Sequence, residues 1–281
     1  MSGTAKSLRA FLDASPSAAL VEVAEAKGST PRDKGAWMLV SPEKIFGTIG
    51  GGQLEFMAID RAREMLTDNP ADKVGVGEAI ILDVPLGPEI GQCCGGRVAV
   101  SIKITDEPIK ADLIAKAEAE DAKHPHVYLF GGGHVGHALA SALALLPVRV
   151  VVVETRAEAL DGMPDSVETC LTAMPEEMVR GAPAGSAYVV LTHDHALDFL
   201  IVAEALRRED AAYVGMIGSK TKKATFRSWY LKTADGTEED FARLVSPIGG
   251  DAVNDKRPAV IAALAAAEIM IAVARADMRY D

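Results

Sequence analysis

The stretch VYLFGGGHVGHALA, residues 127–140, decides the fold of the second half of the chain. An apolar run ends in glycines, which form GxGxxG at Gly131, Gly133 and Gly136, and a helical pattern follows. In a βαβ unit, such a turn presents backbone N–H groups and the positive end of the helix dipole to an anion. The next apolar run ends at Glu154, where an acid that accepts from ribose hydroxyls is expected. The pattern predicts a nucleotide-like ligand; glycines that serve packing alone are the alternative.

The remainder of the second half repeats this alternation of strand and helix. Further β-rich runs lie at 148–153, 187–192 and 212–217, and helical patterns begin near His134, Ala196 and Lys220. Alternation of this kind is typical of a parallel sheet with crossover helices. We therefore predict a Rossmann-like, doubly wound domain over residues 126–281.

The first half has a different organisation, a mixed α+β unit over residues 1–107. Short apolar runs bounded by turn residues predict strands at 18–26, 36–41, 44–50, 78–84 and 97–105. Residues 53–66 predict a helix whose apolar face comprises Leu54, Ala58, Ala62, Met65 and Leu66. A charged, alanine-rich helix over 108–125 is expected to link the two domains.

Composition narrows the class of protein. A net charge of −11 argues against nonspecific binding to nucleic acid or to an anionic membrane surface. Three cysteines, two of them adjacent, form no disulfide framework and fit a reducing cytoplasm. The N-terminus lacks a signal-peptide pattern, and Glu268 interrupts the apolar segment 259–273, so we expect a buried helix there and no membrane span.

Two polar clusters in the second half follow predicted strands. LTHDHALD places His193, Asp194, His195 and Asp198 at the carboxyl edge of the sheet, where ligands bind in such folds. These side chains are candidates for phosphate contact or for a metal site, with helix capping by Asp194 or His195 as the alternative. SKTKKATFR, residues 219–227, gathers cations at a predicted helix start, which suits one small anion or a solvated helix face.

Three strings in the first half point to a known family. They are GSTPRDKGAWMLV at 28–40, GTIGGGQLE at 47–55 and GQCCGG at 91–96. With FGGGHVG and YVGMIGSKTKKATFR in the second half, the chain resembles the XdhC/CoxI family, accessory proteins for xanthine dehydrogenase and related molybdenum hydroxylases. The resemblance covers nearly the whole chain. It implies an N-terminal XdhC/CoxI domain and a C-terminal Rossmann domain.

The resemblance also implies a function, which is to bind molybdenum cofactor (molybdopterin), protect it during sulfuration and insert it into the apoenzyme. The expected partners are an apo xanthine dehydrogenase or related molybdenum hydroxylase, a cysteine desulfurase, and a second copy in a homodimer. SPIGGDAVNDKRPAVIAAL, residues 246–264, lacks the usual run of residues between SPIG and the terminal helix. Partner recognition at that segment is therefore expected to differ.

The cofactor is an anionic, phosphate-bearing pterin dithiolene, so its holder needs backbone donors and a guanidinium. Arg32 would pair with phosphate, Gln92 with a metal oxo group or pterin edge, and Glu55 with pterin N–H groups. A thiolate of Cys93 or Cys94 would approach molybdenum or carry sulfur. The expected cofactor contacts are Ser29, Arg32, Gly50, Gly51, Gly52, Glu55, Gln92, Cys93, Cys94, Gly131, Gly133, His134, Gly136, Glu154, His193, Asp194, Ser219 and Lys220.

Each contact has a structural alternative: Glu55 favours a helix N-terminus through the dipole alone, Arg32 suits a surface, and free cysteines are mostly small core residues.

No catalytic residue and no resident metal site are assigned, because the sequence lacks GxSxG, paired CxxC, HExxH and Walker motifs. This favours a carrier over an enzyme. The alternatives are an NAD(P)-dependent oxidoreductase that uses the Rossmann domain and a metal-dependent transfer enzyme that uses the HDHxxD cluster. We assign the pterin to the first glycine turn and a nucleotide or the cofactor tail to the second.

Overall fold

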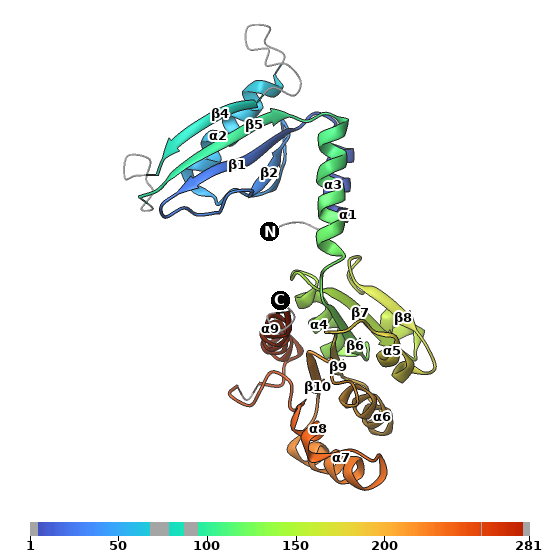
Figure 1. The fold of residues 1–281 in the computed structure, drawn as a ribbon. Coiled ribbons are helices and arrows are strands. Elements are labelled where there is room, and N and C mark those ends of the chain that lie inside the picture. The colour runs from blue at the N-terminus through green and yellow to red at the C-terminus, as the bar shows by residue number, and fades with distance from the viewer. Residues whose placement is uncertain (1–4, 68–78, 87–94, 254, 278–281) are drawn as a thin grey trace. The chain divides into compact units, whose positions relative to one another are not determined.

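The computed structural model describes residues 5–67, 79–86, 95–253 and 255–277 (Figure 1). The chain divides into two compact units, Met1–Ala122 and Lys123–Asp281. The first contains an antiparallel sheet with helices and the second a six-stranded parallel sheet with helices on both faces. The predicted fold class is confirmed for both units.

The first unit is built on a five-stranded sheet in the order β3-β2-β1-β5-β4, with every pairing antiparallel. Its elements are α1 (Ala5–Ala14), β1 (Ala19–Lys27), β2 (Trp37–Val40), β3 (Ile45–Gly47), α2 (Gly52–Leu66), β4 (Ala79–Pro85), β5 (Arg97–Ile104) and α3 (Glu107–Asp121). The predicted strands and the 53–66 helix are present.

Both faces of this sheet are covered by helices. Alternate residues of β1, such as Val21 and Val23, share a core with the apolar stripe of α2, in which Leu54 and Ala58 are buried. On the opposite face, Leu39 of β2 packs with buried residues of α1 and α3. The charged helix α3 thus belongs to the first unit, where its few apolar residues pack against α1.

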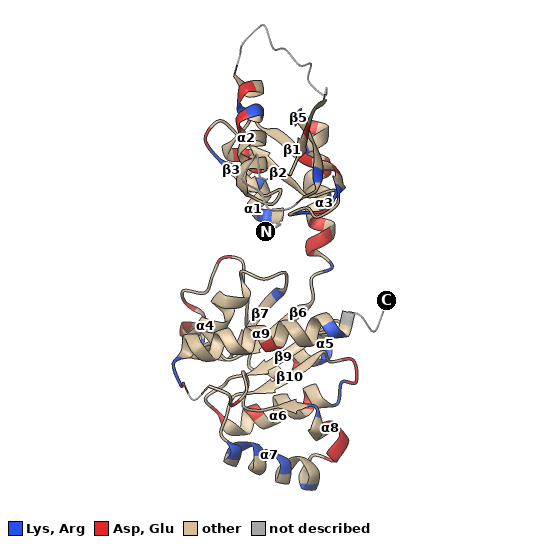
Figure 2. Ribbon diagram, turned by 90° about the vertical axis from the view of Figure 1, so that its left-hand side faces the viewer, with Lys and Arg blue, Asp and Glu red and all other residues tan. Residues whose placement is uncertain are grey.

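The second unit is a parallel sheet in the order β11-β10-β9-β6-β7-β8. Its elements are β6 (His126–Phe130), α4 (His134–Leu143), β7 (Arg149–Glu154), the 3-10 helix η3 (Ala157–Leu160), β8 (Glu168–Leu171), α5 (Pro175–Gly181), β9 (Ala187–Val190), α6 (His195–Leu206), β10 (Tyr213–Met216), α7 (Lys220–Thr233), α8 (Glu238–Ala242), β11 (Leu244–Val245) and α9 (Pro258–Asp277). Lys and Arg residues lie along α7 (Figure 2).

The strand order places a topological switch point between β6 and β9, because the chain leaves β6 for β7 on one side and returns to β9 on the other. Ligands of doubly wound sheets bind outside the carboxyl ends of the strands at such a point. Here the backbones are close: a Cβ on Gly131, at the end of β6, would lie 2.7 Å from the Leu191 carbonyl oxygen after β9. The GxGxxG turn therefore lies at the expected ligand edge.

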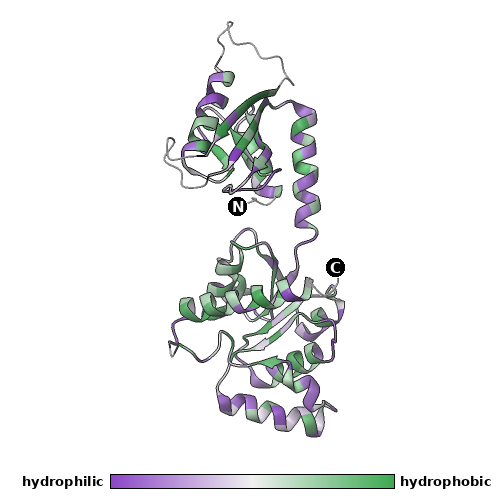
Figure 3. Cartoon of the chain, turned by 60° about the vertical axis from the view of Figure 1, so that its left-hand side comes forward, coloured by the Kyte–Doolittle hydropathy of each residue, from purple (hydrophilic) through white to green (hydrophobic). Residues whose placement is uncertain are grey.

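Helix α9 is mostly apolar, with Glu268 near its middle (Figure 3). Residues Pro258–Ala276 are long and apolar enough to cross a membrane by length and composition. Ala262, Ala265, Ile269 and Val273 nevertheless pack into the core that α9 shares with α4 and the central strands. This face of α9 matches the buried C-terminal helix that the sequence predicts.

Candidate functional site

The GxGxxG turn is closely packed around two of its three motif glycines. A Cβ on Gly136 would lie 2.1 Å from the Gly131 carbonyl oxygen, so the third glycine lets α4 approach the turn. Gly131 has a φ of +121° and touches the β9 loop. A Cβ on Gly133, the N-cap of α4, would meet no atom of the described residues within 4 Å. Of the three motif glycines, Gly133 is therefore the one with free space beside its Cα atom.

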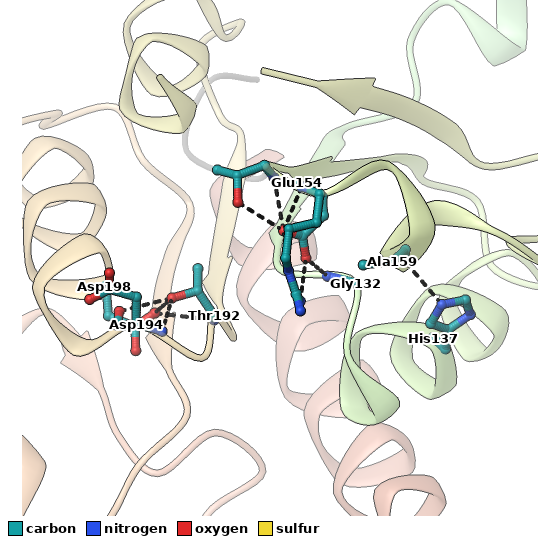
Figure 4. Close-up of polar contacts among 9 residues, drawn as sticks. Gly132, His137, Glu154, Ala159, Thr192, Asp194 and Asp198 are labelled. Carbon is teal, nitrogen blue, oxygen red and sulfur yellow. Dashed lines mark hydrogen bonds and ion pairs between the residues drawn. The ribbon is translucent and has the colours of Figure 1, made fainter. Parts of the chain in front are cut away.

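Glu154 at the end of β7 is directed back toward the glycine turn (Figure 4). Its carboxylate accepts from the backbone N–H groups of Gly132 at 2.9 Å, Thr155 at 2.8 Å and Arg156 at 3.2 Å, and from the Arg156 guanidinium. Only 5% of Glu154 is exposed. Because a carboxylate offers about four lone-pair positions, these donors leave no acceptor capacity for ribose hydroxyls.

The backbone of η3 covers the same side of the turn. A Cβ on Gly132 would lie 2.2 Å from the Ala159 carbonyl oxygen, and the His137 ring nitrogen Nε2 lies 3.1 Å from that oxygen. Protein groups therefore fill the position beside Glu154 where the ribose of a nucleotide-like ligand was expected.

The contacts of Glu154 predict an acid-dependent stability. Burial raises the pKa of this carboxyl, but the hydrogen bonds from Gly132, Thr155 and Arg156 outweigh burial and lower the pKa from 4.5 to about 2. A depressed folded-state pKa stabilises the fold fully above pH 4.5, and this contribution is lost as pH falls toward 2. The shift sets an upper limit of about 3 kcal/mol on this contribution.

We expect Glu154→Gln to lower the unfolding free energy at neutral pH, and the difference from the parent protein to shrink progressively below pH 4.5. Urea titrations at a series of pH values measure this difference. A difference that stays constant down to the pH limit of the folded state would contradict the role of the ionised carboxylate.

The β9–α6 turn is held by hydrogen bonds of its own residues (Figure 4). The Asp194 carboxylate accepts from the N–H groups of Ala196 at 2.8 Å and Leu197 at 3.3 Å, so it caps α6. His193 and His195 are exposed. The geometry of Asp194 matches the capping alternative.

Asp198 is fully buried and committed to protein partners. It accepts from the Thr192 N–H at 3.1 Å and the Thr192 hydroxyl at 2.7 Å, and it forms an ion pair with the Lys222 ammonium. No group of three candidate metal ligands occurs in the described part of the chain. Asp198 thus joins the β9 loop to α7 through Lys222.

Most cations of the 219–227 cluster also have internal partners. Lys222 donates to the Ile217 carbonyl oxygen at 3.0 Å in addition to Asp198, and Lys223 donates to carbonyl oxygens after α8. Arg227 pairs with Glu238. Lys220 is exposed and forms no ion pair within residues 95–253 and 255–277. Ser219 caps α7 by accepting from the Lys222 N–H at 3.2 Å.

A cavity of 790 Å³ lies beside this turn. It brings Ser219 and Lys220 together with Val135 in the first turn of α4 and with the segment before α9, and its other walls include Ile217, Ile248 and Leu264. Of the residues predicted to bind cofactor in the second unit, Ser219 and Lys220 line this cavity.

In the first unit, the three strings singled out in the sequence meet at one place. A Cβ on Gly50 would lie 2.7 Å from Pro31 Cβ and 3.2 Å from Arg32 Cγ. A Cβ on Gly96 would lie 2.4 Å from the Ser29 carbonyl oxygen. The loop that carries Ser29 and Arg32 is therefore in contact with the glycine turn on one side and with the end of the GQCCGG string on the other.

Glu55 stabilises the first glycine turn by accepting hydrogen bonds from the residues of the turn. Its Oε2 accepts from the Thr48 hydroxyl at 2.5 Å and from the N–H groups of Ile49 and Gly51 at 3.0 Å each. The Gly50 N–H donates to the Thr48 hydroxyl at 3.0 Å. Two of the three glycine amides thus bond within the turn, and α2 begins after Gly51 without a side-chain cap on its first-turn amides.

Arg32 is exposed and has no ion-pair partner within the described parts of the chain. It lines a 220 Å³ cavity with Trp37, Phe46 and Thr48. Gln92, Cys93 and Cys94 lie outside the described residues, so their roles stay predictions. Cys170 is half-buried, with its Sγ 3.8 Å from the Met178 sulfur.

Sequence reasoning missed three residues of these sites: Thr48, Arg156 and Lys222. Thr48 and Arg156 are close in sequence to Glu55 and Glu154, so a search for local donors could have found them. Lys222 was grouped with the cations expected either to hold a small anion or to form a solvated helix face, and its pairing with Asp198 joins residues 24 apart in sequence. Only the sheet topology brings those two together.

Comparisons with known proteins agree with this architecture. A model of the XdhC and CoxI family matches residues 11–74, and a model of the XdhC Rossmann domain matches residues 127–269. The uncharacterized protein YqeB of Escherichia coli K12 is 25% identical over an alignment 273 residues long, which covers 90% of this chain and 43% of YqeB. The chain therefore spans less than half the length of that curated relative.

A solved structure described as a xanthine dehydrogenase from Bacillus halodurans superimposes with a TM-score of 0.73. The match covers 96% of this chain and 95% of that one at 15% sequence identity, which shows a shared fold. Since the family models match both halves and the Rossmann model spans about half of the chain, the chain belongs to the XdhC/CoxI family, and its second unit is an XdhC Rossmann domain.

Proposed function

We propose that this chain carries molybdenum cofactor for a molybdenum hydroxylase of the xanthine dehydrogenase type and inserts it into the apoenzyme. Family membership suggests an accessory role for such hydroxylases. In this proposal the protein acts in the cytoplasm as a homodimer, holds the cofactor during sulfuration by a cysteine desulfurase, and releases it to the hydroxylase.

One observation carries the proposal: a guanidinium without an ion-pair partner among the described residues lies next to a glycine turn that leads into a helix. Arg32 Cγ lies against Gly50, and α2 starts two residues later without a side-chain cap on its first amides. A phosphate needs charged, bidentate donors and backbone N–H groups, and this arrangement offers both. These residues fit the phosphate of a pterin cofactor.

The chain's own residues would have separate tasks. Arg32 would pair with the phosphate, and the first-turn amides of α2 would add weaker donors. Glu55, already bonded to Ile49 and Gly51, would hold the turn in its open shape. Gln92, Cys93 and Cys94 remain proposed contacts to the molybdenum end. The bound cofactor would supply the metal and dithiolene that the hydroxylase uses.

The test is the amount of cofactor that copurifies from a host that makes it. We expect Arg32→Ala to reduce the pterin content and the molybdenum content together by about tenfold or more, because a charge-assisted contact to phosphate is lost. Pterin is measured by fluorescence after oxidation and molybdenum by elemental analysis, both under anaerobic handling.

Arg61→Ala is the matched control, because Arg61 lies on α2 of the same unit and pairs with Glu64 of the same helix. The control is expected to keep the parent content. Parent protein without pterin and molybdenum, or an Arg32→Ala protein with a full complement, would exclude the proposed carrier site.

A further inference from the structure

We infer that the second unit binds a phosphate monoester carried on a single flat ring system, in the cavity between β10, α7 and the start of α9, and that Lys220 and Lys256 contact the phosphate. The ligand is a mononucleotide or a phosphate-bearing pterin, and not a dinucleotide. This site lies in the other unit and does not depend on Arg32, so a mononucleotide ligand goes beyond the proposed function, whereas a pterin ligand rests on it.

The switch point is closed on its β7 side. The Glu154 carboxylate already accepts hydrogen bonds from Gly132, Thr155 and Arg156. The Ala159 carbonyl oxygen lies directly against the glycine turn. A dinucleotide in a Rossmann domain places one ribose at this acid. Only one half of a dinucleotide site is therefore left, on the β10 side.

The β10 side is open. The 790 Å³ cavity begins at Val135 in the first turn of α4 and is walled by Ile217, Ile248, Ile261 and Leu264. Small-molecule cavities are commonly about 300–1,000 Å³ and mostly apolar with a few polar groups. This cavity is large enough for one ring, a sugar or a second ring, and one phosphate.

The charges at the mouth of the cavity select an anion. Lys220 and Lys256 line it, both are exposed, and neither has an ion-pair partner among the described residues. Two acids also line it: Asp255 is neutralised by a two-pronged pair with Arg257, and Asp251 is exposed to solvent. The two free ammonium groups are thus opposed by one free carboxylate.

Among the cations of residues 219–227, Lys220 is the one that we assign to the phosphate, because the others have partners within the protein. Lys222 is bound to Asp198 and Ile217, Lys223 to the carbonyl oxygens of Leu244 and Ser246, and Arg227 to Glu238. Lysine binds phosphate as a point charge. An exposed lysine at the rim, without an ion-pair partner among the described residues, therefore suits the phosphate of a ligand whose ring lies among isoleucine and leucine side chains.

The test is calorimetric titration of the full chain, purified without cofactor, with nucleoside monophosphates and with hydroxymethylpterin monophosphate. We expect at least one of them to bind about tenfold more tightly than its unphosphorylated counterpart. Lys220→Ala and Lys256→Ala are each expected to weaken binding about tenfold. Lys232→Ala is the control, because Lys232 is exposed in the last turn of the same helix.

The tighter of the two probe classes identifies the source of the phosphate monoester, and NAD is expected to bind no more tightly than AMP. The inference is overturned if no probe binds at millimolar concentration, if both lysine variants bind like the parent, or if NAD binds about tenfold more tightly than AMP. Cofactor content in the Arg32 experiment and phosphate binding here are separate readouts, so either can fail alone.

Discussion

Gly136→Ala is expected to lower the unfolding free energy of the second unit by about 3 kcal/mol or more. The new Cβ would lie 2.1 Å from the Gly131 carbonyl oxygen, and both groups belong to backbone. No side chain can rotate to relieve that contact. The clash separates α4 from the end of β6, where α4 also contributes Leu139 and Ala140 to the core.

Gly133→Ala is the matched control within the same motif. Gly133 has a φ of −74°, which alanine adopts freely, and a Cβ there would meet no described atom within 4 Å. We expect a change of less than about 0.5 kcal/mol. Urea unfolding followed by circular dichroism measures both variants; a Gly136→Ala protein as stable as Gly133→Ala would mean that the turn adjusts at little cost.

The central elements were predictable because local pattern and tertiary environment agree. Strand β7 is a run of valines that is buried on both faces, and the apolar stripe of α2 is the face that packs on the sheet. The two edge strands of the parallel sheet were not predicted. Three of the four residues of β8 are exposed and β11 is two residues long, so both depend on pairing with a neighbouring strand that sequence periodicity does not report.

The direction in which the two glutamate side chains point was also not predicted from the sequence. Glu55 and Glu154 were each expected to face a ligand, and each instead accepts from amides of its own glycine turn. For Glu55, the spacing of four residues from Gly51 is a local signal that could have been read. For Glu154 the partner is 22 residues away, and the turn of η3 over the glycines fixes the direction of the side chain.

This internal bracing gives the two turns a common physical feature. A glycine turn brings several backbone N–H groups together, and leaving them without acceptors costs free energy. A carboxylate supplied by the fold satisfies part of each set before any ligand arrives. Beside the first-turn amides of α2, which have no side-chain cap, the charged donors left for a ligand are side chains at the rim, and for this reason Arg32 and Lys220 carry the proposals above.

The second large effect is expected at the buried ion pair between Asp198 and Lys222. Lys222→Met removes the cation and leaves the carboxylate, which has no exposed surface, with Thr192 as its remaining hydrogen-bond partner among the described residues. An uncompensated buried charge costs about 3–5 kcal/mol. The pair also joins the β9–α6 loop to α7, so the rim that carries Ser219 and Lys220 is expected to loosen at the same time.

Two further variants distinguish the stability cost of an uncompensated buried charge from the cost of losing an ion pair on the surface. Arg227→Ala breaks the exposed pair with Glu238 and is expected to cost at most about 1 kcal/mol. Asp198→Asn combined with Lys222→Met removes both charges, and we expect this double variant to be more stable than Lys222→Met alone. If the double variant is instead the least stable in urea unfolding, the cost arises from lost packing of the lysine stem and not from the stranded carboxylate.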